Sequence, residues 1–124
     1  MTHRKSNYTL INTPTRIPVP GNKIIAEFLG RVNSHTAQAS VARMEAPGGW
    51  TEPVQTPAFD EITILLAGQM QIQIADESVT LKAGQVLIVN QGVKVQYSNP
   101  FADTAVYWAI CLPAFSPELA NRSE

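Results

Sequence analysis

Apolar and polar residues alternate along most of this chain, and the alternation predicts β-strands. The clearest segment is 69–75, where Met70, Ile72 and Ile74 alternate with three glutamines. Because successive side chains of a strand point to opposite faces, this pattern predicts a strand with one buried face and one solvent-facing face. No window of about twelve residues carries a convincing helical period of apolar positions.

Similar reasoning predicts further strands at residues 23–29, 37–46, 59–66, 79–82, 85–89, 93–97 and 105–112, with a short edge strand around 8–11. Glycine, proline and asparagine separate these segments, and Asn90-Gln91-Gly92 predicts a hairpin turn between the strands on either side of it. Ser116 followed by Pro117 predicts the start of a short helix. About nine short strands with regular turns predict an all-β sandwich or barrel.

Residues 59–66 contain the first candidate for function. The odd-numbered side chains of a strand here share one face and the even-numbered ones share the other. Beyond Asp60 the even-numbered face is wholly apolar (Ile62, Ile64 and Leu66), so it is predicted to be core. The odd-numbered face carries Glu61 among bulky residues, where a carboxylate is costly unless it is paired or hydrogen-bonded.

Composition places the chain among globular proteins and excludes several partners. The 124 residues suffice for one domain, and 44% hydrophobic against 15% charged residues is too apolar for a disordered chain. A net charge of −1 with mixed signs favours neither nucleic acid nor a membrane surface as a partner. The single cysteine, Cys111, indicates a reducing compartment, and we interpret it as a buried apolar residue. With no transmembrane-length or signal segment, we expect a cytoplasmic location.

Prolines and glycines suggest the domain organisation. Pro14, Pro18 and Pro20 remove backbone donors from the start of the chain. We therefore predict an extended N-terminal arm at residues 1–22, a barrel at residues 23–115, and a C-terminal turn and tail at residues 116–124. Arms of this kind lie across their own domain or across a neighbouring subunit.

Two motifs resemble the paired motifs of the cupin superfamily. Glu61 and Gly68 keep the spacing Glu-x6-Gly, and Gly84, Gly92 and Asn99 keep the glycine and asparagine frame of the second motif. The resemblance implies a double-stranded β-helix, or jelly-roll, barrel with a pocket at one end. Segments 16–21, 40–44, 59–61 and 111–117 are also similar to small single-domain bacterial cupins, including ethanolamine-utilisation cupins. That narrower resemblance implies no particular chemistry.

The metal-binding residues of the family do not occur at the matching positions. Metal-binding cupins carry two histidines before the glutamate and a third in the second motif. Here the first two positions fall on Val54 and Thr56, or on Gln55 and Pro57, and the third falls on Val95. A carboxylate and an amide oxygen alone do not make a competitive transition-metal site. We therefore expect no bound metal and no other cofactor.

Four residues are candidates for binding a ligand inside the barrel: Arg43, Gln55, Glu61 and Tyr97. The resemblance implies that Glu61 points inward, where it is a general base, a ligand's hydrogen-bond partner or half of a structural pair with Arg43. Arg43 either faces solvent, which ordinary burial tendencies favour, or faces inward and selects an acidic ligand. Gln55 lies on the rim at a histidine-equivalent position. Tyr97 shares strand parity with Val95, so it faces the pocket if Val95 does.

Two functional hypotheses follow. The first is a cupin that binds a small organic ligand without a histidine-ligated metal. The alternative is an isomerase-, lyase- or dioxygenase-like enzyme in which Glu61 and Tyr97 are catalytic, with or without an atypical metal. The position where relatives carry a further histidine is Asn121 here, which weakens the acid–base hypothesis. The resemblance also implies a homodimer joined through sheet edges and the N-terminal arm.

Overall fold

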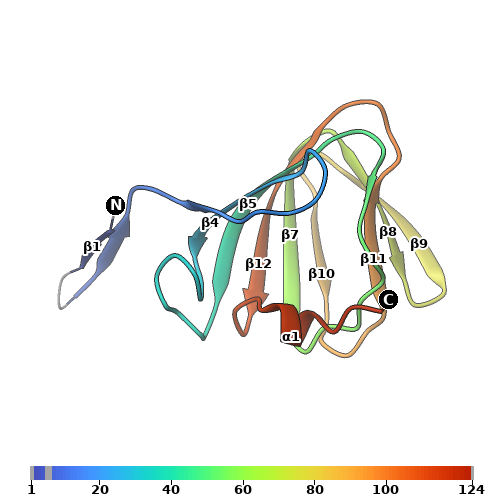
Figure 1. Cartoon of the computed structure of the whole chain (residues 1–124). Helices are drawn as coiled ribbons and strands as arrows, with labels where there is room; N and C mark the ends of the chain where they lie inside the picture. Colours follow the sequence, from blue (N-terminus) through green and yellow to red (C-terminus); the bar gives the residue numbers. More distant parts are fainter. Residues whose placement is uncertain (1, 5–6, 124) are drawn as a thin grey trace.

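The computed structural model describes residues 2–4 and 7–123 and contains two antiparallel β-sheets that face each other (Figure 1). The six-stranded sheet has the order β10 (Val86–Val89), β7 (Asp60–Ala67), β12 (Ala105–Leu112), β5 (Ser40–Ala46), β4 (Ile24–Leu29) and β3 (Thr15–Arg16). The four-stranded sheet has the order β6 (Trp50–Thr51), β11 (Val95–Asn99), β8 (Gln69–Ile74) and β9 (Glu77–Lys82). This is the predicted jelly-roll arrangement.

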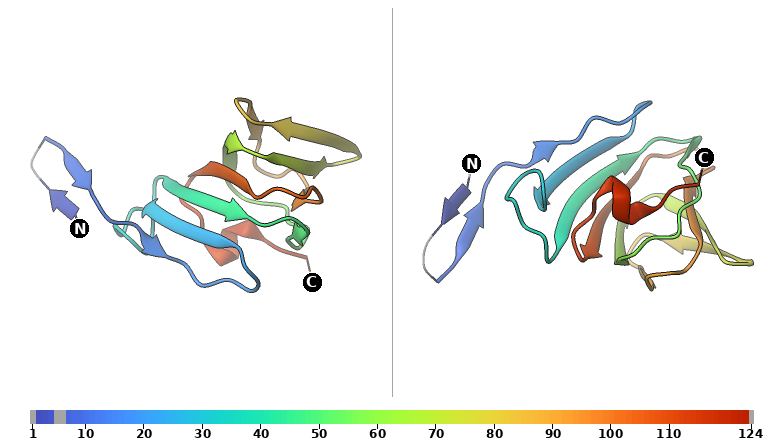
Figure 2. Two further views of the ribbon diagram at one scale, coloured as in Figure 1. Left: turned by 90° about the horizontal axis from the view of Figure 1, so that it is seen from above. Right: turned by 60° about the horizontal axis from the view of Figure 1, so that its bottom comes forward.

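Two smaller elements lie outside the sheets. The strands β1 (Thr2–Arg4) and β2 (Thr9–Ile11) pair as a hairpin that projects away from the barrel in every view (Figures 1 and 2). The predicted helix is α1 (Pro117–Ala120), and the Ser116 hydroxyl accepts a hydrogen bond from the Leu119 N–H at 3.1 Å as its N-cap. None of the described residues form a helix with the length and apolar character needed to cross a membrane.

The strand predictions are largely confirmed, and β8 shows why. Met70 and Ile72 are fully buried between the sheets, while Gln69 and Gln73 are exposed, as the alternation requires. Three short strands, β1, β3 and β6, were not expected from the pattern. Each contains only two or three residues, so none is long enough to show an alternation.

The predicted hairpin at Asn90-Gln91-Gly92 is wrong. β10 pairs with β7 and β11 pairs with β8, so the chain crosses from one sheet to the other at this turn. Gly92 has a positive φ of 82°, and its N–H donates to the carbonyl of Pro57 at 2.7 Å. A local turn signal does not distinguish a hairpin from a crossing between sheets, because both need the same backbone reversal.

The prediction for the two faces of residues 59–66 is also wrong. Thr63 and Leu65, on the odd-numbered face, are 1% exposed, while Leu66 on the even-numbered face is 48% exposed. The face that carries Glu61 is therefore the interior of the barrel. The wholly apolar face is the outer surface of the six-stranded sheet.

A fully buried asparagine, Asn99 at the end of β11, is hydrogen-bonded to the end of β5 and to the loop before β12. The Asn99 amide nitrogen donates to the carbonyls of Ala46 and Asp103, and its oxygen accepts from the Phe101 N–H. These bonds use both N–H donors of the side-chain amide and one of the two lone pairs of its oxygen. Leucine, isoleucine, methionine and tyrosine side chains pack beside it between the sheets. A second cluster, Phe59, Cys111 and Ala120 with Phe115 and Leu119, lies under α1.

Candidate functional site

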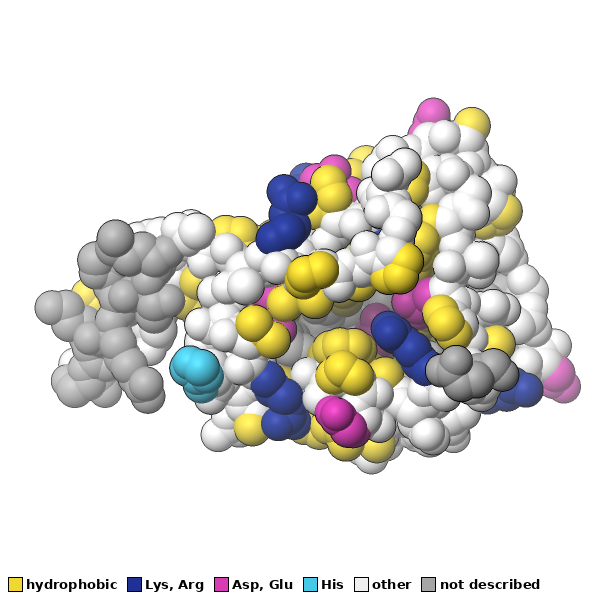
Figure 3. All heavy atoms as spheres, in the orientation of Figure 1, with side chains coloured by type: hydrophobic (Ala, Val, Ile, Leu, Met, Phe, Trp, Pro, Cys, Tyr) yellow, Lys and Arg dark blue, Asp and Glu magenta, His cyan; other side chains and the backbone are white. Residues whose placement is uncertain are grey.

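A cavity of about 690 Å³ lies inside the barrel. Its lining comes from strands β4, β5, β7, β11 and β12 and from the segments beside them. These segments are residues 17–21 and 23, the loop residues 31 and 32, residues 49–55, and the C-terminal residues 115–117 and 122. Figure 3 shows this face of the molecule hollowed between hydrophobic side chains, with basic and acidic side chains beside the hollow. The volume lies within the range of ordinary small-molecule sites.

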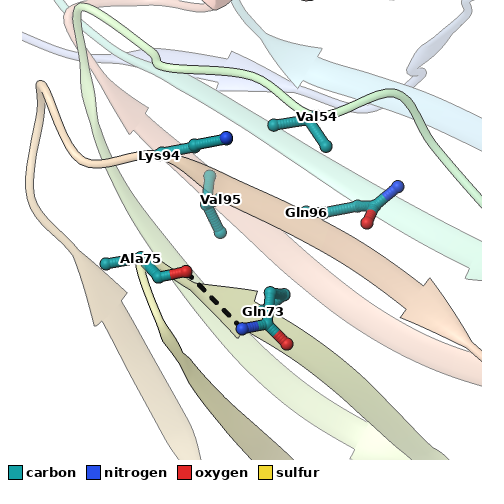
Figure 4. A pocket seen from close by; sticks show the side chains of 6 residues that line it. All are labelled: Val54, Gln73, Ala75, Lys94, Val95 and Gln96. Carbon is teal, nitrogen blue, oxygen red and sulfur yellow. Dashed lines mark hydrogen bonds between the residues drawn. The ribbon is translucent and has the colours of Figure 1, made fainter.

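A second hollow, outside the barrel, has a volume of only about 40 Å³ (Figure 4). Gln73, Lys94 and Gln96 are among the residues that line it, and the Gln73 amide bonds to the carbonyl of Ala75. This space accommodates at most a few water molecules. The large cavity is therefore the candidate site.

Glu61 lies on the cavity wall, near the start of β7, the second strand from one edge of the six-stranded sheet. Its neighbours in register are Val89 of β10 and Cys111 of β12. Its remaining exposed surface faces the cavity and not bulk solvent. Burial, with a smaller contribution from the like charge of Glu52, raises the pKa of Glu61 to about 8. The carboxyl group is thus protonated at neutral pH and presents an O–H donor.

Tyr97 lies on β11 of the opposite sheet and also lines the cavity. The side chain is 3% exposed, and its hydroxyl has no hydrogen-bond partner among the described residues. The hydroxyl is near enough to Glu61 to lower the pKa of that carboxyl, although the two groups do not meet in hydrogen-bond geometry. Burial raises the pKa of Tyr97, so the phenol is neutral at physiological pH.

Lys23 and Glu52 form a long, largely buried ion pair at the cavity. The Lys23 Nζ is 3.9 Å from the nearer Glu52 carboxylate oxygen, and their side chains are 6% and 14% exposed. The ammonium also lies 3.8 Å from the centre of the Trp50 ring and 5.6 Å from that of Tyr107. Burial outweighs these favourable contacts and lowers the pKa of Lys23 to about 8. Burial likewise raises the pKa of Glu52.

Gln55 and Arg122 connect the rim of the cavity to the C-terminal tail. The Gln55 backbone bridges to both Val95 and Arg122, and its side-chain oxygen accepts a hydrogen bond from the Arg122 Nε at 3.4 Å. Arg122 is exposed, and its guanidinium lies 5.7 Å from the centre of the Phe115 ring. The tail thereby places another positive charge beside the cavity, in addition to those of Lys23 and Arg31.

Three of the four predicted site residues meet at this cavity: Gln55, Glu61 and Tyr97 line it. Arg43 does not, because Ala42 and Met44, its neighbours on β5, are the ones that face inward. Its guanidinium instead bonds to the Glu45 carboxylate at 2.8 Å on the outer face of the sheet. The solvent-facing alternative for Arg43 describes the structure, and the proposed pair with Glu61 does not form.

Sequence reasoning missed five charged residues of the cavity: Lys23, Glu27, Arg31, Glu52 and Arg122. A signal existed for the first. Lys23 and Glu27 share strand parity with Ile25, so one face of the predicted strand 23–29 carries two charges beside an apolar residue. Arg122 comes from an irregular tail, for which no periodic pattern exists.

The residues around Glu61 do not fit a resident metal ion. Among residues 7–123, whose side chains the structure describes, no three side chains of histidine, cysteine, aspartate or glutamate come close enough together to hold one. The groups nearest the Glu61 carboxyl include the Lys23 ammonium and the Tyr97 phenol. The Lys23 ammonium beside the Glu52 and Glu61 carboxyl groups disfavours a cation there, and no imidazole is among the residues that line the cavity.

Comparison with known proteins identifies the domain. The family model described as "Cupin domain" matches residues 42–112. The endoribonuclease YbeY of Myxococcus xanthus strain DK1622 is 42% identical over 118 residues, a match that covers 95% of this chain but only 40% of that protein. Because this chain spans less than half of that relative, the name of the longer protein assigns it no activity.

Two solved structures show the same architecture over most of the chain. One is described as an ethanolamine utilization protein Q from Salmonella typhimurium LT2, with a TM-score of 0.70, 16% identity, and coverage of 93% of this chain and 94% of that one. The other is an RmlC-like cupin with a double-stranded β-helix fold from Methanocaldococcus jannaschii, with a TM-score of 0.65, 16% identity, and coverage of 92% and 90%. At such identities the likeness shows the fold alone.

Proposed function

The chain belongs to the cupin domain family, and on that premise we propose that it binds one small organic molecule inside its barrel. The observation that supports this proposal is a set of cavity-lining polar groups without hydrogen-bond partners. Glu61, Lys23 and the Tyr97 hydroxyl make no hydrogen bond with the described residues, although each is largely enclosed by protein.

Buried polar groups are normally hydrogen-bonded, and leaving one without a partner costs about 1–3 kcal/mol. Several such groups on one cavity wall therefore favour a site whose ligand completes their hydrogen bonds. Among the described residues, the Glu52 carboxylate likewise has the ion pair with Lys23 as its single polar contact. The remaining lining is largely apolar, with Ile25, Met44 and Ala109 among its residues, which is typical of small-molecule sites.

An enzymatic role is the second candidate, and one observation favours it. A carboxyl group with a pKa of about 8 exchanges its proton near neutral pH, which suits a general acid or base. In that role Glu61 would transfer a proton to or from the ligand, and Tyr97 would hold the reacting oxygen by its hydroxyl. The lowered pKa of Lys23 provides a second group that exchanges protons in the same pH range.

Calorimetric titration tests the binding proposal. The probes are a panel of carbon skeletons, each carried as a carboxylate, a primary amide and an amine. Ala42→Phe, which fills the cavity with a ring, is expected to abolish binding of every compound that binds the native protein. Glu45→Gln, a change on the outer face of the same strand, controls for altered charge and is expected to leave binding intact. If Ala42→Phe folds and retains full affinity, or if no probe binds the native protein, the proposal fails.

The predicted homodimer also remains a proposal. The observation that supports it is the apolar outer face of β7 and of the edge strand β10, where Val86 and Ile88 are 55% and 60% exposed. Tyr8 and Leu10 on the projecting arm are equally exposed. A monomer leaves the outer face of β7 and β10 and the apolar side chains of the arm in water. Association of two copies would cover both surfaces at once.

A further inference from the structure

The charges around the cavity are not balanced. Lys23 and Arg122 are cationic at neutral pH, Glu52 is the facing carboxylate, and Glu61 is protonated. Glu27 and Arg31 also line the cavity, and their opposite charges cancel. The Glu27 carboxylate accepts hydrogen bonds from the backbone of the loop that follows β4, and the Arg31 Nε donates to the Ala114 carbonyl at 3.2 Å. Apart from these two residues, two cations face one anion across the lining.

Hydrogen-bond capacity is unbalanced in the same direction. The Lys23 ammonium has three donors and no hydrogen bond with the described residues, since its nearest carboxylate oxygen is 3.9 Å away. Toward the part of the chain that the structure describes, the Arg122 guanidinium uses its Nε alone, in a long bond of 3.4 Å to Gln55. The protonated Glu61 adds one further donor. The cavity thus offers a surplus of donors, which an acceptor-rich ligand would satisfy.

We propose that the ligand of this cavity is a small organic acid with a single carboxylate, held by Lys23 and Arg122, with its carbon skeleton against the apolar walls. This inference rests on the proposed function and names the class of ligand for the same site. The carboxylate would accept hydrogen bonds from the ammonium and the guanidinium. The Glu61 O–H would donate to a neutral oxygen elsewhere on the ligand, or to the carboxylate itself.

Other charge classes fit less well. An organic cation would add to the excess of positive charge that Lys23 and Arg122 leave beside Glu52. A doubly charged ligand would leave one negative charge unmatched, because the excess is a single positive charge. A neutral ligand would leave the ammonium without a charged partner at hydrogen-bond distance.

The same geometry makes binding depend on pH. The groups that face Lys23 and Glu61 are Glu52, Arg122, and the phenols of Tyr97 and Tyr107, with Cys111 beside Glu61 on β12. As pH rises through about 8, Lys23 loses its charge and Glu61 gains one. Both changes oppose a bound carboxylate, so its affinity is expected to fall by about tenfold or more between pH 7 and pH 9.

The matched panel of carboxylates, amides and amines tests the inference by calorimetric titration at pH 7. For the skeletons that bind, we expect the carboxylate to bind about tenfold or more tightly than its amide, and the amine to bind more weakly than either. Lys23→Met and Arg122→Met should each bring the carboxylate close to its amide and leave the amide unchanged. Arg16→Met and Lys82→Met, which remove exposed cations away from the cavity, serve as matched controls.

The outcomes separate this inference from the function on which it rests. If amides or amines bind as tightly as carboxylates and Ala42→Phe abolishes their binding, the cavity is a ligand site but the acidic ligand class is wrong. If carboxylates bind and neither Lys23→Met nor Arg122→Met changes the ratio to the amide, the assigned residues are wrong. If nothing in the panel binds, both proposals fail. Circular dichroism of each variant shows whether it has folded.

Discussion

Glu61→Gln is the substitution with the largest expected effect on stability. Ionising the buried Glu61 carboxyl costs free energy, and glutamine is a neutral group of nearly the same shape that avoids this cost. In the folded protein the pKa of Glu61 is about 8, against an ordinary value of 4.5. The folded state therefore holds a proton that the unfolded state releases, over an interval of about 3.5 pH units.

The sign follows from proton binding. Between pH 4.5 and about 8 the folded state binds more protons than the unfolded state, so the free energy of unfolding falls as pH rises. The slope for one proton is about 1.4 kcal/mol per pH unit, so the whole interval amounts to about 5 kcal/mol. This is an upper limit, because water in the cavity solvates the carboxylate. Below pH 4.5 the effect is absent, and above about pH 8 it no longer grows.

The measurement is urea unfolding of the native protein and Glu61→Gln at intervals from pH 5 to pH 9. The difference in free energy of unfolding should be small at pH 5, should grow in favour of Glu61→Gln by up to about 1.4 kcal/mol per pH unit, and should level off above pH 8. Lys23 and Glu52 are present in both proteins, so their own pKa shifts cancel to first order. Glu45→Gln on the outer face controls for the loss of one negative charge.

Two results would refute this reasoning. Parallel stability curves from pH 5 to pH 8 would mean that Glu61 ionises equally easily in the folded and unfolded states. A Glu61→Gln variant that is less stable at every pH would mean that the native carboxylate is charged and paired, most simply with Lys23. In either case the cavity would hold a different charge from the one proposed.

Three further predictions concern stability and association. Thr63→Val should raise the free energy of unfolding by about 1 kcal/mol in urea, because the buried Thr63 hydroxyl has no hydrogen-bond partner among the described residues; a loss of stability would reveal one. Gly68→Ala should lower the free energy of unfolding by about 3 kcal/mol, because the φ of Gly68 is +79° and a Cβ there would lie 2.5 Å from the Thr104 carbonyl oxygen. Gly84→Ala is the matched control. Gly84 has a φ of +89° but open space around it, so this substitution should lower the free energy of unfolding by only about 1 kcal/mol. Light scattering at micromolar concentration should show a dimer for the native chain and a monomer for Ile88→Lys; a native monomer would end the association proposal.

Part of the candidate site could be predicted from single strands. Glu61 was found because a carboxylate interrupts an apolar strand face, and Tyr97 because it shares parity with a position matched by a family motif. Both signals are local to one strand. Lys23 meets Glu61 through the pairing of β4, β5, β12 and β7, and that order does not follow from any local pattern.

The sequence by itself determined where most of the strands lie, which side chains share a face, and the α1 N-cap, because alternation and capping act over a few neighbouring residues. Only the tertiary structure decided which face of β7 is the interior. Both of its faces carry large apolar residues, so hydrophobic burial alone does not rank them. The tertiary structure also decided which charges lie near the carboxyl of Glu61. The two sheets pack face to face, with the arm and the C-terminal tail beside the cavity, and this packing places Lys23, Glu52 and Arg122 near that carboxyl. Contacts between distant segments depend on the order of strands in a sheet, and that order is a property of the whole chain.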